Sequence, residues 1–362
     1  MADFTLNPGS VSTSTIEKLV AKTVDTVLNY SPATLFFLGQ QKTWSGNLMR
    51  FPIKYQQNTQ GIAFDGLQKF STTKVENFAY MSFSPTGREM PTVISQMEVD
   101  VNASNRVIDL IARQMSSDAQ DMADTVAGKF YTVQSGIEFL SLIDAVDDGT
   151  YGSGSYGGLS RTTYTGIKGN VTTSVGNLTL INLRTAYNNA THGSDSPNVI
   201  FTTKAVWAYY EKLLTPTLQN QIGATAIAGY AKFTGASDAG LPNIVAPGTK
   251  LNASQGFNAI YFNGVPMIAD EKCPTGYMFG LNTRTIAFYG LKSTGEGYKN
   301  VTFMDDASMD SVYNIPVTTG FSWSGFNLPI DQYGKVGHIL LMGNLICQNP
   351  RLNFLMTGIT GS

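Results

Sequence analysis

Two groups of acidic residues are the first candidates for chemistry in this sequence. Asp144, Asp147 and Asp148 lie close together, and Asp305 and Asp306 are adjacent. Paired carboxylates could act as general acid and general base, or bind a divalent cation. Acidic pairs in loops are more often solvated or matched to a partner subunit, so we assign no catalytic or metal site to them.

A glycine-rich segment is the second candidate. Gly152-Ser-Gly-Ser-Tyr-Gly157 matches the dinucleotide-binding pattern GxGxxG. That pattern binds a pyrophosphate when it lies between a strand and a helix, whose amides then face the phosphates. Here it follows Asp147-Asp148-Gly149 and leads into Arg161-Thr-Thr, which fits neither element. We therefore expect no dinucleotide cofactor.

The histidine and cysteine residues also provide no clear catalytic or metal site. The two histidines are His192, expected at a helix end, and His338, expected as a packed side chain in an apolar strand. Cys273 and Cys347 show no CxxC or Cys/His spacing, which favours two free thiols in a reducing cytoplasm over a disulfide or zinc site. These residues predict a protein without a cofactor that is not an enzyme.

Composition points to a large chain with few charges. The chain has 362 residues, enough for one large or two interleaved domains, and charged residues make up 14%, against roughly 25% in typical soluble domains. The net charge of −2 argues against a strongly basic nucleic-acid reader, so any DNA contact should be weak and local. The first residues resemble no secretory signal, no apolar run is long enough to span a membrane, and a soluble cytoplasmic protein is expected.

The first third of the chain predicts an arm, a long hairpin and a long helix. Residues 1–46 are polar and then amphipathic, with a helix opened by Thr13 or Thr15 and ended near Pro32. Alternating strands at Leu48–Tyr55 and Val75–Phe83 enclose the polar stretch Gln56 to Lys74. Such a hairpin must rest on its own domain or on a partner subunit.

A helical pattern follows from Ser104 to about Ser135, with Asn102 or Ser104 as cap. Apolar residues recur at three- and four-residue steps, and periodicity alone does not separate a core helix from a coiled-coil strand. Residues 147–177 are rich in Gly, Ser, Thr and Tyr and predict a mobile connector or exposed flap. A second helix is expected at Leu178–Ala190, capped by Asn177.

The rest of the chain predicts a strand, a helix, a hairpin and two terminal strands. Val199–Phe201 should form a strand, and Thr202 or Thr203 should cap a helix that stops near Pro216. Asn263-Gly264 lies between two apolar runs and predicts a two-residue type I′ turn. Residues 337–356 read as two buried strands around Asn349-Pro350, which must join a sheet built from earlier segments.

Taken in order, these elements resemble the α+β fold shared by tailed-phage major capsid proteins. The likeness covers nearly the whole chain, although it rests on an ordered set of elements and on no single diagnostic motif. It implies an N-terminal arm (1–46), an extended hairpin loop (47–102), a peripheral domain with a spine helix (103–177), an axial domain (178–320) and returning strands of the peripheral domain (321–362).

The resemblance implies a coat protein that assembles as hexamers and pentamers into an icosahedral head around double-stranded DNA. Its partners would be itself, scaffolding and portal proteins, in some members a cement protein, and DNA through weak non-specific contact, with no membrane. It would assemble in the host cytoplasm and reside in the virion capsid. The alternatives are an encapsulin-like nanocompartment shell and, further away, an unrelated soluble enzyme or β-rich adhesin.

The resemblance also assigns roles to residues. Some members cross-link a loop lysine to a neighbour's asparagine, but no acceptor is identifiable here and no cross-link is predicted. The expected intersubunit contacts of the extended loop are Gln60, Phe64, Asp65, Lys69, Phe70 and Lys74; the spine helix would carry Ile108, Ile111, Met115 and Met122, and the axial hairpin Asn263 and Gly264.

Overall fold

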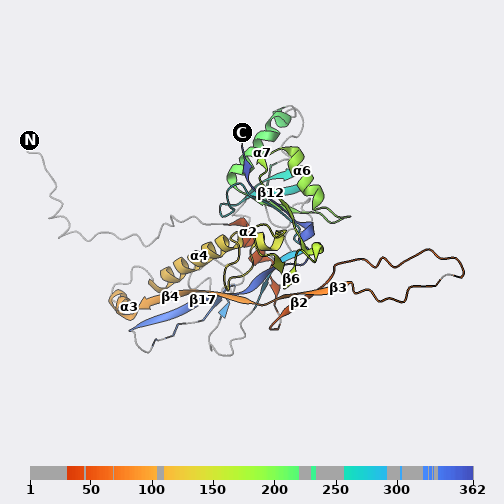
Figure 1. Ribbon diagram of the computed structural model, residues 1–362. Coiled ribbons are helices and arrows are strands. Elements are labelled where there is room, and N and C mark those ends of the chain that lie inside the picture. Colours follow the sequence, from red (N-terminus) through yellow and green to blue (C-terminus); the bar gives the residue numbers. More distant parts are fainter. Residues whose placement is uncertain are drawn as a thin grey trace, which may run out of the picture.

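The computed structural model describes residues 31–44, 46–67, 69–103, 110–219, 230–233, 257–291, 302–303, 321–324, 326–327, 329 and 333–361. The helix expected in the first 30 residues lies outside this part of the chain, as do Ile108, Asp305 and Asp306. Two mixed sheets, each with helices packed on it, form the body, and a two-stranded hairpin extends away from them (Figure 1).

The first sheet is organised around one long strand, β17 (Gly334–Cys347). Residues 334–343 of β17 pair antiparallel with all of β4 (Thr86–Ser95), and its later residues pair with β14 (Ile286–Gly290). The remaining strands are short: β1 (Lys42–Thr43), β15 (Thr302–Phe303) and β16 (Ser322–Trp323). Helix α4 (Leu110–Phe130) contacts β4, and its Met115, Met122 and Phe130 are fully buried in the core.

The second sheet has seven strands in the order β10-β11-β12-β9-β13-β18-β7. Helices α6 (Leu180–Asn189) and α7 (Lys204–Gln219) lie against it (Figure 1). β9, β12 and β13 are almost wholly buried, which explains their continuous apolar sequences. The strands are β7 (Asn170–Thr172), β9 (Val199–Thr202), β10 (Tyr230–Phe233), β11 (Phe257–Phe262), β12 (Val265–Ala269), β13 (Met278–Leu281) and β18 (Phe354–Met356).

Short elements complete the described chain. Helix α2 (Pro32–Gly39) is capped by Ser31 and packs against α4, and α5 (Leu142–Val146) begins with a capping box of Ser141 and Asp144. The others are α3 (Gln96–Ala103), β5 (Ser155–Tyr156), β6 (Leu159–Ser160), η1 (Thr165–Ile167), β8 (Gly176–Asn177), η3 (Pro350–Leu352) and β19 (Ile359–Thr360).

The Asn-Gly turn between β11 and β12 has the expected geometry. Asn263 and Gly264 have φ angles of 49° and 79°, and Phe262 pairs with Val265 across them. Positive φ at both central positions is what a type I′ turn requires.

Replacing Gly264 with valine should therefore destabilise the protein by about 1–2 kcal/mol, because a β-branched residue resists positive φ. Urea unfolding of the purified variant measures this loss. Gly264→Asn is the matched control and should unfold close to wild type, since asparagine tolerates the left-handed region. Equal stability of the valine and asparagine variants would show that the turn does not depend on this conformation.

Several predicted helix limits were wrong. α6 begins at Leu180 because Thr179, rather than Asn177, caps it by accepting a hydrogen bond from the amide of Asn182. α7 is capped by Thr203, as expected, but it continues through Pro216 to Gln219, three residues beyond the predicted stop.

The long helix also ends earlier than expected. It stops at Phe130, where the amides of Tyr131 and Thr132 turn back to carbonyls three residues earlier, instead of reaching Ser135. Residues 96–103 form helix α3, so Asn102 lies within a helix and is not an N-cap, and the other proposed cap, Ser104, lies outside the described residues.

The glycine-rich segment 147–177 is not an exposed flap. Asp147 is fully buried and Arg161 is 1% exposed, and their side chains form an ion pair of 3.1 Å. Further donors to the Asp147 carboxylate are the amides of Thr150, Tyr151 and Gly152. Composition alone suggested mobility, but the buried charge pair and these amides hold residues 147–161 together. The buried Tyr156 ties the segment to the core, because its hydroxyl accepts a hydrogen bond from the amide of Cys347 in β17.

The two terminal strands belong to different sheets. β17 joins the first sheet and β18 joins the second, and η3 turns the chain between them. β14 likewise lies within the predicted axial range, 178–320, yet pairs in the first sheet. The assignment of the two sheets to peripheral and axial domains remains a prediction.

Candidate functional site

The candidate site is the projecting hairpin of β2 (Met49–Lys54) and β3 (Phe78–Phe83). The strands pair antiparallel over six residues, from Met49 opposite Phe83 to Lys54 opposite Phe78. One face of the ribbon rests on the body, because Met81 and Phe83 are buried and the Phe51 ring lies 6.1 Å from Phe83 and 5.7 Å from Tyr289. The base of the hairpin is therefore fixed by aromatic packing.

Hydrogen bonds also join the two strands of the hairpin where the loop begins. The amide of Tyr55 donates to the carbonyl of Asn77 at 3.0 Å, and the Tyr55 hydroxyl donates to the carbonyl of Glu76 at 2.7 Å. The ring of Tyr55 also meets Tyr164 edge-on at 4.9 Å. Beyond this point the loop extends away from both sheets (Figure 1).

The loop tip, residues 60–71, exposes a set of apolar side chains. Phe64 and Phe70 meet edge-on at 5.1 Å but remain 62% and 64% exposed, and Leu67 is 99% exposed. Ile62 is also exposed, and the hydroxyl of Ser71 donates to the side chain of Gln60 across the loop. Such a concentration of exposed apolar groups on a projecting segment is typical of an interaction surface.

The predicted charged residues of the loop lie on its surface. Asp65, Lys69 and Lys74 are exposed, and Lys74 forms a surface ion pair of 3.4 Å with Glu76. Sequence reasoning missed Ile62 and Leu67 as exposed apolar residues, although their position in an otherwise polar stretch was the available signal. The role of this whole set in contact between subunits remains a prediction.

The other predicted site residues lie elsewhere in the fold. Met115 and Met122 are fully buried, so their side chains pack the core. Ile111 lies in α4, and Asn263 and Gly264 form an exposed turn of the second sheet. Among the predicted residues whose side chains the structure describes, those of the extended loop form an exposed apolar surface and the others do not.

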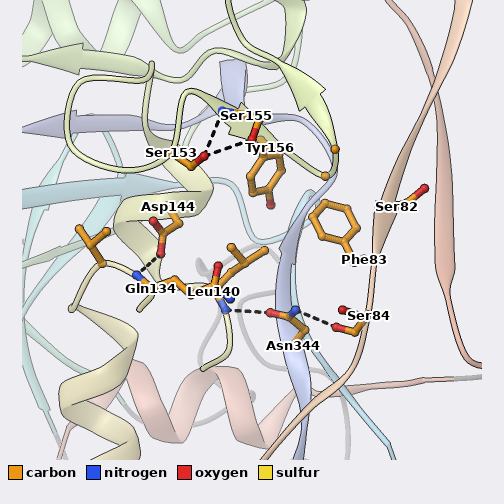
Figure 2. Close-up of a pocket in the computed structure, with 13 residues that line it drawn as sticks. Ser82, Phe83, Ser84, Gln134, Leu140, Asp144, Ser153, Ser155, Tyr156 and Asn344 are labelled. Carbon is orange, nitrogen blue, oxygen red and sulfur yellow. Dashed lines mark hydrogen bonds between the residues drawn. The ribbon is translucent and has the colours of Figure 1, made fainter. Parts of the chain in front are cut away.

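A cavity of about 280 Å³ lies at the base of the hairpin (Figure 2). Its polar groups hold the fold together. Asp144 accepts hydrogen bonds from the amide of Gln134 and from Ser141, while Asn344 accepts from the amide of Leu140 and donates to the carbonyl of Ser84. The carboxylate considered first for chemistry is therefore engaged in helix capping.

The described residues show no assembled catalytic or metal centre. Among them, no group of three or more His, Cys, Asp or Glu side chains could hold a metal ion. Cys273 and Cys347 are buried and free, and burial raises the pKa of Cys347 to about 12, which keeps that thiol protonated and a poor nucleophile. None of the helices in the described ranges is long and apolar enough to cross a membrane.

Known proteins resemble this chain in structure and not in sequence. No family model and no curated protein sequence matches it. The capsid asymmetric unit of cyanophage A-1(L) shares 14% identity over 98% of this chain and 100% of its own, with a TM-score of 0.68. The chain has the tailed-phage capsid-protein fold.

Two more solved structures with the capsid-protein fold resemble this chain. A chain from the capsid of a native GTA particle has a TM-score of 0.56 at 8% identity, and covers 99% of this chain and 100% of its own. The SrpI encapsulin of Synechococcus elongatus PCC 7942 has a TM-score of 0.55 at 12% identity, and the match covers 98% of this chain and 96% of the encapsulin chain. The predicted α+β capsid fold is thus confirmed, and both shell types share it.

Proposed function

We propose that this chain is the major capsid protein of a tailed bacteriophage, which assembles with copies of itself into a closed shell. The observation that carries the proposal is the apolar tip of a projecting hairpin in a chain with the capsid-protein fold. Burial of a large apolar side chain contributes about 1.5–3 kcal/mol, so four such residues against a neighbour would strongly favour association.

The proposal also covers the arrangement of the subunits, the contents of the shell and the further partners. Hexamers and pentamers would enclose double-stranded DNA, with scaffolding, portal and cement proteins as further partners, in a head assembled in the host cytoplasm. The net charge of −2 supports only weak, local DNA contact. The role is structural, and no residue is assigned to catalysis.

A second candidate is an encapsulin-like nanocompartment shell, which the similarity to the SrpI encapsulin favours. Such a shell would enclose a cargo protein through a short peptide and would need neither portal nor scaffold. The two candidates therefore differ in what the shell contains and in which proteins it incorporates.

Electron microscopy of the purified protein, with and without a scaffolding protein, tests the proposal. We expect closed shells, tubes or six-fold rings. A dispersed monomer under every condition would contradict both shell functions. Shells that incorporate a portal and package double-stranded DNA would support the phage assignment, whereas shells that retain a cellular cargo protein would favour the encapsulin-like one.

A further inference from the structure

The register of the hairpin fixes which backbone groups point away from it. The bond from the Tyr55 amide to the Asn77 carbonyl shows that this pair is hydrogen-bonded. In an antiparallel ladder such pairs alternate with pairs whose amides and carbonyls point outward. From this register, the residues whose backbone amides and carbonyls point outward are Arg50, Pro52 and Lys54 on β2, and Phe78, Tyr80 and Ser82 on β3.

The two outer edges of the hairpin are not equivalent. The edge of β2 has Pro52 at its central outward position, and a proline has no amide to offer a further strand. The edge of β3 has Tyr80 at the matching position, opposite Pro52, with its amide intact. One edge is thus protected against strand pairing and the other is competent for it.

The β3 edge already accepts a partner at one end. The amide of Ser82 donates to the carbonyl of Gly157 at 2.9 Å, beside the cavity at the base of the hairpin (Figure 2). Gly157 has φ of 58°, and a Cβ there would lie 2.8 Å from the Cβ of Met81, so only glycine permits this close approach. The chain's own loop therefore covers the edge at Ser82.

Beyond Ser82 the edge is open in the described structure. β2 and β3 form a sheet of two strands, and no hydrogen bond to the outward amides and carbonyls of Phe78 and Tyr80 occurs within the residues described. Their side chains are 67% and 61% exposed. Lys54 and Pro52 lie opposite them on the same exposed face, which is aromatic and, with Arg50 further along β2, has two positive charges.

We propose that a neighbouring copy of this chain adds an extended segment to the β3 edge, with hydrogen bonds to the backbone of Phe78 and Tyr80. This inference rests on the proposed self-assembly. The occupant is a second copy because the edge continues through residues 72–77 into the exposed loop tip, residues 60–71, on the same projecting element. A copy that lies along this element from the tip toward the body would meet the edge, whereas within the described residues the chain's own body bonds to it at Ser82.

Tyr80→Pro tests the pairing, because it removes an outward amide without removing a bond between β2 and β3. The critical protein concentration for shell assembly, measured by sedimentation and electron microscopy, should rise about tenfold, as expected for the loss of one or two net hydrogen bonds. The matched control Tyr80→Val removes the aromatic ring but keeps the amide, and should change that concentration by less than about threefold. An unchanged Tyr80→Pro variant, or equal effects of both, would overturn the inference.

Hydrogen exchange of the wild-type chain gives an independent test that does not depend on how a variant folds. The amides of Phe78 and Tyr80 should exchange at least about tenfold more slowly in shells than in unassembled protein, while Ser82 should be protected in both. Shells in which Phe78 and Tyr80 still exchange fast would overturn the edge pairing alone. Failure of the wild type to form any shell would overturn the proposed function, and the pairing with it.

Discussion

Arg161→Ala is expected to lower the free energy of unfolding by about 3–5 kcal/mol, because it leaves a buried carboxylate without its counter-charge. The side chains of Arg161 and Asp147 are 2% and 0% exposed. Burial lowers the pKa of the Arg161 guanidinium, and the nearby charge of Asp147 opposes that shift. Arg161 also donates to the backbone carbonyls of Asp144 and Ser153, so its loss leaves these acceptors unpaired as well.

Arg284→Ala is the matched control for this prediction. Arg284 pairs with Asp195 at 3.5 Å, but the side chains are 75% and 47% exposed, and exposed pairs contribute at most about 1 kcal/mol. Urea unfolding of both variants, followed by circular dichroism, compares the same side chain and the same type of pair in two environments. Similar stabilities of the two variants would show that segment 147–177 is not held by its buried charge.

Several local sequence signals predicted local structure correctly, although the cap proposed for α6 was wrong. The hairpin β2–β3 followed from alternation on either side of a polar stretch, and the Asn263-Gly264 turn followed from the conformational freedom of two residues. Thr203 was one of two proposed caps of α7. Each of these depends on residues near one another in the chain, so the sequence contains the necessary information.

Long-range contacts explain what the sequence did not reveal. The buried carboxylate of Asp270 accepts hydrogen bonds from the hydroxyls of Ser31, 239 positions away, and Tyr131. The ion pair of Asp147 with Arg161 likewise depends on how the segment 147–177 folds back on itself. No local pattern marks such partners, and an aspartate in a polar stretch looks solvated until its donors are known.

In the candidate site, too, some features were predictable from the sequence and others were not. A protruding loop was predictable, and so were its charged residues, since charges in a polar stretch are normally exposed. The exposed apolar residue Leu67 and the open edge at Tyr80 were not predicted, because apolar side chains are expected to be buried and the direction of an amide depends on strand register.

Deleting residues 60–71 should leave a folded protein that no longer forms closed shells. Apart from the partly buried Gln60, the described residues of this segment are exposed. Phe64 contacts Phe70 and Ser71 contacts Gln60 within the segment itself, so the body should keep its packing. The shell loses Ile62, Phe64, Leu67 and Phe70, each of which contributes about 2 kcal/mol when buried against a neighbour. Thermal unfolding of the monomer and electron microscopy of assembly mixtures measure the two effects separately.

Two double variants divide the effect of the deletion between apolar burial and charge. Phe64→Ser with Phe70→Ser removes the aromatic pair and should reduce shell formation nearly as far as the deletion does. Asp65→Asn with Lys69→Gln keeps the apolar side chains and removes only exposed charges, whose pairs contribute little, so shells should still form. Normal shells from the deletion would refute the role of the loop in contact between subunits. Loss of shells only in the charge variant would show that the contact depends on ion pairing rather than on apolar burial. We therefore expect the exposed apolar side chains of the loop tip, rather than its charged residues, to make the contact that closes the shell.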